Sequence, residues 1–201
     1  MKQEELLKKI KNFALEKLPS DDIHGYGHTE RVYLLSVKIG QKMKANMLVL
    51  KVAVFLHDIG RYSKEIDRIN VNHAEISAKI AANYLRDLEF QFKEKDFENV
   101  IHCIQTHSYS NQKLPQTLEA KILSDADKLD ALGAIGLYRT IGYTTKMNGN
   151  LQDVILHLKD KLFKLHTRLF LDISKKLAQK RLLILEEFYE EIKNELKNHR
   201  K

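Results

Sequence analysis

The 201-residue chain contains one cysteine, two prolines, eight glycines and no tryptophan, and these low counts narrow the possible folds. A single cysteine, Cys103, has no partner for an internal disulfide, which is typical of proteins in a reducing compartment. Its apolar surroundings indicate a buried, inert thiol rather than a nucleophile. Pro and Gly are too scarce for the many tight turns of a β-sandwich, so an all-α fold is favoured.

Long apolar runs are also missing, and none is long enough to span a bilayer. The first residues, MKQEELLKKIKNF, are charged throughout and lack the apolar centre of a signal peptide, so we expect a cytoplasmic protein without a membrane partner. Hydrophobic residues make up 43% and charged residues 30% of the chain, which is typical of a globular protein. The net charge of +7 favours anionic partners such as nucleotides or nucleic acid, without choosing among them.

Apolar residues recur at helical spacing nearly everywhere, which predicts one domain over residues 1–201, built as a helical bundle. The core that holds the functional site is expected over about 20–145, with Gly60 ending the third helix. Residues 61–70 are expected to form a polar loop. The predicted helices span about 2–17, 26–43, 47–58, 72–89, 96–107, 117–131 and 131–141, followed by one or two long amphipathic helices over about 151–199.

Four polar side chains fall where the core is expected. His28 begins an apolar helix face, and His57 follows the most hydrophobic predicted helix, with Asp58 about 100° further around. Asp127 falls among small apolar residues, where a carboxylate cannot stay ionised without a partner. Each residue alone is more often structural: a hydrogen-bonded core histidine, a loop aspartate or a salt-bridged carboxylate. Together they favour a divalent cation bound by two imidazoles and two carboxylates.

A mixed nitrogen and oxygen site suits manganese, magnesium, iron, nickel or zinc. Water on such a metal becomes a nucleophile near neutral pH, and the metal also screens the charge of a phosphate group.

Three segments carry a family resemblance: HTERV at 28–32, LHDIGR at 56–61 and SDADKLDALGAIG at 124–136. They resemble the ordered signature of the HD-domain phosphohydrolases, and the chain is most similar to small stand-alone bacterial and archaeal members. The resemblance implies an all-α fold of the HD/PDEase-like type, with His28, His57, Asp58 and Asp127 as metal ligands. It also implies hydrolysis of a phosphate ester or phosphoanhydride. One departure is that Gly25 follows His24, where the subgroup often has an acidic residue.

Basic residues near these motifs are candidates for phosphate contacts. Arg61 and Lys128 are expected to bind substrate oxygens and to stabilise charge in the transition state. Arg31 either contacts phosphate or forms an ion pair with a neighbour such as Glu30 or Asp130. Asp130 is a candidate general base, or else it orients Arg31.

Two further histidines, His73 and His107, are expected to line the pocket around the predicted metal site and to contact substrate. Binding of a second metal, contact with phosphate and simple hydrogen bonding all remain open for this pair.

Three functions follow from these residues. The first is a metal-dependent phosphohydrolase, either a pyrophosphohydrolase or a phosphatase, acting on a nucleotide or another phosphorylated metabolite as a monomer or homodimer. The second is an HD-type nuclease or cyclic-nucleotide phosphodiesterase. Nucleic acid is the less favoured partner, because the 8% aromatic content shows no stacking platform interleaved with basic residues. The third is a catalytically silent nucleotide-binding module.

Overall fold

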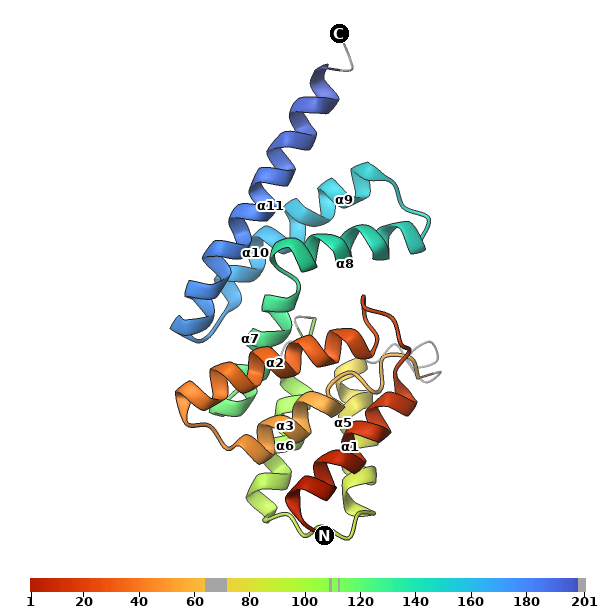
Figure 1. Cartoon of the computed structure of the whole chain (residues 1–201), viewed down its shortest axis with the longest axis vertical. Coiled ribbons are helices and arrows are strands. Elements are labelled where there is room, and N and C mark those ends of the chain that lie inside the picture. Colours follow the sequence, from red (N-terminus) through yellow and green to blue (C-terminus); the bar gives the residue numbers. More distant parts are fainter. Residues whose placement is uncertain (64–71, 109, 112, 199–201) are drawn as a thin grey trace. The chain divides into compact units, whose positions relative to one another are not determined.

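The computed structural model describes residues 1–63, 72–108, 110–111 and 113–198, and within these ranges every regular element is helical (Figure 1). The all-α prediction is therefore confirmed. The chain forms two compact units, residues 1–127 and residues 128–201. None of the described helices combines the length and the apolar character needed to cross a membrane.

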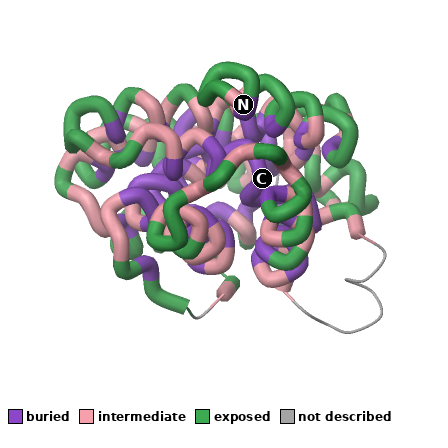
Figure 2. The backbone as a smooth tube through the Cα atoms, turned by 90° about the horizontal axis from the view of Figure 1, so that it is seen from below, coloured by how far each residue is buried: buried purple, intermediate pink, exposed green. Residues whose placement is uncertain are grey.

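The first unit is built around one apolar helix. Its helices are α1 (Gln3–Lys17), α2 (Tyr26–Met43), α3 (Met47–Leu56), α5 (His73–Arg86), α6 (Glu94–Thr106) and α7 (Leu118–Asp130), the last of which continues into the second unit. Helix α3 packs against α1, α2, α5 and α6. All but three of its ten residues are buried, because its sequence MLVLKVAVFL is apolar on nearly every face. Figure 2 shows buried positions along the inner faces of the surrounding helices.

The start of α3 is fixed by polar groups. The Asn46 side chain accepts the N–H of Val49 at 3.3 Å, as an N-cap residue does. Glu119 of α7 accepts the backbone N–H of Asn46 at 2.7 Å and the side-chain amide of Asn99 at 2.9 Å. A nearly buried carboxylate thus ties α7 and α6 to the N-terminus of α3.

The start of α2 depends on a tight turn. The Asp21 carboxylate accepts the backbone N–H groups of Ile23, His24 and Gly25 at 2.9 to 3.1 Å. A Cβ at Gly25 would lie only 2.2 Å from the Pro19 carbonyl oxygen, so no larger residue fits without moving the backbone. The glycine that follows His24 is therefore explained by the turn.

The second unit carries the last helices. They are α8 (Gly133–Lys146), α9 (Leu151–His157), the π-helical turn η1 (Leu158–Leu162), α10 (Phe163–Leu165), the 3₁₀ turn η2 (His166–Arg168) and α11 (Asp172–Asn198). Helix α8 packs on α11 and on α9. Leu158, Leu162 and Leu165 are buried on one face, and Leu182 and Leu185 are buried on α11. The sequence predicted one or two long helices here, and the structure has one long helix preceded by shorter segments.

Several predicted boundaries shift by a few residues. Helix α3 ends at Leu56 rather than at 58, so His57 and Asp58 lie in the turn that follows it. The second predicted helix, 26–43, has the observed bounds. Of the predicted polar loop at 61–70, only residues 61–63 are described, and they form a turn; the rest lies outside the described residues.

Candidate metal centre

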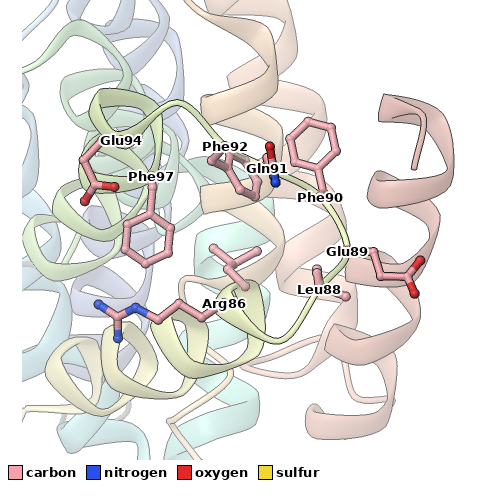
Figure 3. A pocket seen from close by; sticks show the side chains of 9 residues that line it. Arg86, Leu88, Glu89, Phe90, Gln91, Phe92, Glu94 and Phe97 are labelled. Carbon is pink, nitrogen blue, oxygen red and sulfur yellow. The ribbon is translucent and has the colours of Figure 1, made fainter.

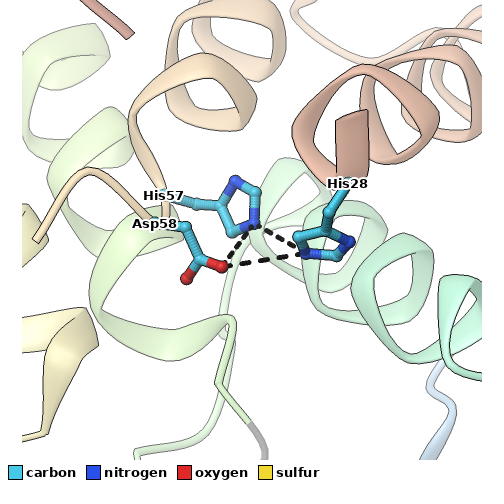
Figure 4. Close-up of side chains that lie close together, drawn as sticks. All are labelled: His28, His57 and Asp58. Carbon is cyan, nitrogen blue, oxygen red and sulfur yellow. Dashed lines mark hydrogen bonds and ion pairs between the residues drawn. The ribbon is translucent and has the colours of Figure 1, made fainter. Parts of the chain in front are cut away.

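Three fully buried side chains meet where α2 and the end of α3 approach each other (Figure 4). The Nε2 atoms of His28 and His57 are 3.4 Å apart. Asp58 Oδ2 lies 3.8 Å from His28 Nε2 and 3.7 Å from His57 Nε2. Three potential ligand atoms from two elements therefore surround one point.

The protonation of His57 is set by its backbone. His57 Nδ1 lies 2.7 Å from the carbonyl oxygen of Val54, and only a protonated Nδ1 can donate to that oxygen. Nε2 of the neutral ring then carries a lone pair directed at the cluster. Burial lowers the pKa of His57 to about 4, so the ring is neutral at neutral pH.

This donor set fits a divalent cation. In the absence of a cation, lone pairs and carboxylate oxygens would face one another in a buried space, which is costly. A cation turns the same atoms into a favourable arrangement, and the neutral imidazole and ionised carboxylate are the forms that bind metal. The group formed by His28, His57 and Asp58 can therefore hold a metal ion.

Asp127, near the end of α7, is the fourth predicted ligand. Its Oδ1 lies 3.2 Å from His28 Nε2, and its side chain is 21% exposed. Burial acts to raise the pKa of Asp127, but the hydrogen bond and charge of His28 outweigh it and the pKa is lowered. The sequence predicted Asp127 in the core, whereas the structure places its partly exposed carboxylate at the edge of the cluster.

A second group shares Asp58 with the first. Asp58 Oδ1 lies 3.3 Å from His73 Nε2 and 3.4 Å from His107 Nε2, and the two Nε2 atoms are 3.3 Å apart. His107 Nδ1 donates to the carbonyl of Ile104 at 2.7 Å, the same arrangement as in His57. Asp58, His73 and His107 therefore form another set that can hold a metal ion, with Asp58 between the two.

Arg61 supplies positive charge to Asp58. Its Nε donates to Oδ2 at 2.8 Å and its Nη2 to Oδ1 at 3.1 Å, and Nη2 also lies 3.1 Å from His73 Nε2. Burial acts to raise the pKa of Asp58, but the charge of Arg61 and the hydrogen bonds of His107 and His73 hold it well below its usual value. Asp58 is therefore ionised at neutral pH.

A carboxylate that the sequence did not single out ties α5 to the end of α6. Glu75 accepts Lys113 Nζ at 2.7 Å, the Asn111 amide at 3.1 Å and the Gln105 amide at 3.3 Å. Lys113, Asn111 and their hydrogen bonds hold the pKa of Glu75 down against burial, which acts to raise it. Because Glu75 follows His73 by two residues and Gln105 precedes His107 by two, this contact holds the helix ends that carry the two histidines.

The remaining predicted site residues have other partners. Arg31 donates to the carbonyl of Asp22 at 2.7 Å. In the second unit, Lys128 is nearly buried with its Nζ 5.6 Å from the centre of the Phe170 ring, and Asp130 accepts Arg139 Nη1 at 2.8 Å. The roles assigned to Arg31, Lys128 and Asp130 stay predictions.

A pocket of about 400 Å³ lies at a different place in the first unit (Figure 3). Arg86 and the rings of Phe90, Phe92 and Phe97 line it, at the end of α5 and the start of α6. Arg86 and His73 occupy opposite ends of α5, whose 14 residues extend about 20 Å. The pocket is therefore separate from the histidine cluster.

Comparison with known proteins identifies the family. The model of the HD domain matches residues 25–132, which include all four predicted metal ligands. The chain belongs to the HD-domain family. The match ends within a few residues of the start of the second unit, so most of residues 128–201 lie beyond it.

Two known proteins are similar to most of the chain. YpgQ of Bacillus subtilis is 26% identical over 181 residues, covering 86% of this chain and 84% of YpgQ. The crystal structure of YpgQ in complex with ADP aligns with a TM-score of 0.78 at 25% identity, over 97% of each chain. An HD-superfamily hydrolase from Bacillus thuringiensis aligns with a TM-score of 0.73 at 26% identity, over 98% of this chain and 99% of that one.

A third similarity is confined to part of the chain. Ribonuclease Y of Chloroflexus aurantiacus is 31% identical over 103 residues, which cover 51% of this chain but only 17% of the ribonuclease. The likeness therefore concerns a shared domain of a much longer protein.

Proposed function

We propose that this HD-domain protein is a metal-dependent phosphohydrolase that acts on a nucleotide or a similar phosphorylated metabolite. The observation that carries the proposal is the buried convergence of His28, His57 and Asp58 in a chain of the HD-domain family. The likeness to HD-superfamily hydrolases supports hydrolysis, and the ADP complex of YpgQ supports a nucleotide as ligand.

His28, His57, Asp58 and Asp127 are the proposed metal ligands. A divalent cation at this cluster supplies Lewis-acid charge for a phosphate oxygen and lowers the pKa of water. The chain itself supplies neutral imidazoles and ionised carboxylates, since burial keeps His57 uncharged and Arg61 keeps Asp58 ionised. The Val54 carbonyl fixes the His57 ring, so its Nε2 needs no reorientation on binding.

His73 and His107 are proposed to act at the second oxygen of Asp58. They either hold another cation there or bind a phosphate oxygen of the substrate, and their 3.3 Å separation suits both roles. Metal content distinguishes the two, because only the first raises it to two ions per chain.

Substrate phosphate is proposed to meet basic residues of the motifs. Arg61 has a partly exposed guanidinium already placed beside Asp58, and it is the strongest candidate. Arg31 and Lys128 remain in the proposal because they lie within three residues of His28 and next to Asp127 in the sequence. Asp130 remains the proposed general base.

A phosphodiester substrate is the second candidate, because the HD region resembles part of a ribonuclease. It predicts cleavage of RNA or of a cyclic dinucleotide by the same cluster, so both belong in the substrate test.

The test is a mass-resolved substrate panel. Wild-type protein with manganese is incubated with nucleoside mono-, di- and triphosphates, cyclic dinucleotides and a short RNA. Asp58→Asn and Asp127→Asn remove proposed ligands at nearly constant shape, and Asp87→Asn, at the exposed end of α5, serves as the matched control. We expect turnover by wild type and the control only, and the products show which bond breaks. Full activity of Asp58→Asn would refute the site.

A further inference from the structure

Helix α11 carries opposite charges on its two halves. Residues 175–181 contain four Lys and Arg and no acid, whereas residues 186–195 contain five Glu and one Lys. The four residues between them, LLIL at 182–185, are apolar. A helix with this polarity is complementary to a second copy of itself that runs in the opposite direction, because the basic half of each copy then faces the acidic half of the other.

One side of α11, the α11 face, displays this pattern to solvent. Its six exposed residues lie within about 100° of the helix circumference. They are Lys176, Lys180, Leu183, Ile184, Glu187 and Glu191. Their spacings of 4, 3, 1, 3 and 4 residues read the same in both directions, with the sign of the charge reversed about the centre. Ala178, Leu182 and Leu185 are buried on the other side of the helix, so the α11 face points away from the core of the second unit.

The four charged residues of the α11 face form no ion pair with any residue that the structure describes. Charges beside the face are paired, Lys175 with Asp172 at 3.3 Å and Lys193 with Glu190 at 3.1 Å. On the face itself the two lysines stand four residues apart, and so do the two glutamates, which places like charges side by side on a single helix. An antiparallel copy would bring an opposite charge to each of them.

We propose that two copies of this chain associate through their α11 faces, with the helices antiparallel and a two-fold axis between Leu183 and Ile184. This arrangement makes the same patch of both copies self-complementary. Lys180 of each copy then lies opposite Glu187 of the other copy, and Lys176 lies opposite Glu191. Leu183 and Ile184, which are 57% and 42% exposed in the single chain, meet at the axis and are removed from water.

The size of the contact sets its strength. The α11 face extends over 16 residues, about 24 Å of helix, which is less than a standard stable interface. Burial of the four apolar side chains at the axis provides attraction, while the exposed ion pairs mainly select the antiparallel arrangement. We therefore expect a dissociation constant on the order of 10–100 µM. Every residue of the face belongs to the second unit, so the association does not depend on the proposed metal cluster or on hydrolysis.

The experiment is sedimentation velocity of the full chain in EDTA at about 50 mM KCl, over concentrations from about 5 to 500 µM. Glu187→Lys/Glu191→Lys and Lys176→Glu/Lys180→Glu should each weaken dimer formation at least tenfold, because each places like charges opposite one another. The fourfold exchange that combines both variants restores opposite charges across the axis. It should therefore dimerise within about threefold of wild type. Raising KCl to about 500 mM should weaken the wild-type dimer.

Two controls separate the contact from general charge repulsion. Glu16→Lys/Glu98→Lys makes the same change of net charge at exposed positions of the first unit, and it should leave dimer formation within about twofold of wild type. The variant Lys176→Glu/Lys180→Glu lowers the net charge, so repulsion between whole chains cannot explain its loss. Circular dichroism checks that each variant is folded.

Cysteine cross-linking tests the direction of the helices. In a Cys103→Ser background, Leu183→Cys places the two introduced thiols next to the axis, where a short bismaleimide should join the copies. Lys176→Cys places them about 22 Å apart along an antiparallel pair, so it should not cross-link. A parallel pair would join the copies at both positions.

Four results would overturn the proposal. They are a wild-type chain that stays monomeric at 500 µM, a fourfold exchange that fails to regain the dimer, an equal loss in the first-unit control, and cross-linking through Lys176→Cys as fast as through Leu183→Cys. Loss in both double variants, recovery in the fourfold exchange and cross-linking at position 183 alone support it, whatever the outcome of the hydrolase assay.

Discussion

Arg61 donates hydrogen bonds to both oxygens of the Asp58 carboxylate, from Nε to Oδ2 at 2.8 Å and from Nη2 to Oδ1 at 3.1 Å. The same two oxygens face the two histidine groups, so one ion pair borders both candidate metal positions. The chain therefore holds its central carboxylate in place before any ligand arrives.

Replacing Arg61 should destabilise the metal-free protein more than the metal-loaded one. Arg61→Met leaves the buried Asp58 charge uncompensated, which costs about 3 kcal/mol in the free energy of unfolding. A bound cation supplies the missing positive charge, so manganese should recover most of the loss. Chemical denaturation in EDTA and in manganese measures both values, with Arg31→Met as control. An equal loss under both conditions would show that Arg61 acts by packing alone.

The contact between Glu75 and Lys113 should couple the loop after α6 to the site. Glu75→Ala and Lys113→Ala should each weaken manganese binding at the His73 and His107 group. The charge exchange Glu75→Lys/Lys113→Glu should restore part of the lost manganese affinity. The coupling free energy should be about 0.5–1 kcal/mol, since the pair is partly exposed. Titration of manganese binding reports the effect. If the change in manganese-binding free energy of Glu75→Lys/Lys113→Glu equals the sum of the changes for Glu75→Lys and Lys113→Glu alone, the proposed coupling is contradicted.

Variants of the buried ion pair between Asp130 and Arg139 test whether Asp130 has a structural or a catalytic role. Arg139→Met should lower the free energy of unfolding by about 3 kcal/mol, because it removes the guanidinium that donates to the buried Asp130 carboxylate at 2.8 Å. Lys175→Met, in an exposed pair with Asp172, should cost less than about 0.5 kcal/mol. If Asp130→Asn abolishes turnover without lowering stability, the carboxylate serves the reaction rather than the fold.

Cys103 should stay unreactive until the chain unfolds. Burial and the charge of Glu119 raise the pKa of its thiol, so the folded protein keeps it protonated at pH values where an exposed cysteine ionises. Because the unfolded chain then releases a proton that the folded chain retains, stability should fall as pH rises above about 9. At pH 8.5, alkylation by iodoacetamide should be over tenfold slower than in denaturant.

A cysteine at an exposed position gives the matched control for that labelling. Leu34 on α2 is 62% exposed, so Leu34→Cys in a Cys103→Ser background should react at the rate of a free thiol. Rapid labelling of native Cys103 would mean that α6 opens far more often than its packing suggests.

Local patterns in the sequence predicted much of this molecule. The largely apolar stretch of α3 indicated a central helix, and seven of its ten residues are buried. The apolar face that begins with His28 indicated a side chain facing inward, and His28 is fully buried. These predictions succeeded because helical periodicity relates neighbouring residues directly to a face.

Other features depend on contacts that periodicity does not encode. Asp127, Ala131 and Ala134 follow helical spacing in the sequence, which predicts that they share one face, but α7 ends at Asp130 and the helical register is lost there. Ala134 is consequently exposed, and Asp125, which the sequence did not single out, is fully buried. The link from Glu75 to Lys113 spans residues far apart in the chain and could not be found from local pattern.

His57 and His107 each follow the last residue of a helix and bind the carbonyl three positions back, at 2.7 Å in both cases. The orientation of each ring is thus determined by a single turn of its own backbone. The orientation of the ring therefore needs no residue from another part of the fold. Placing the same turn at the ends of two antiparallel helices in a designed bundle would orient two imidazoles toward a common point.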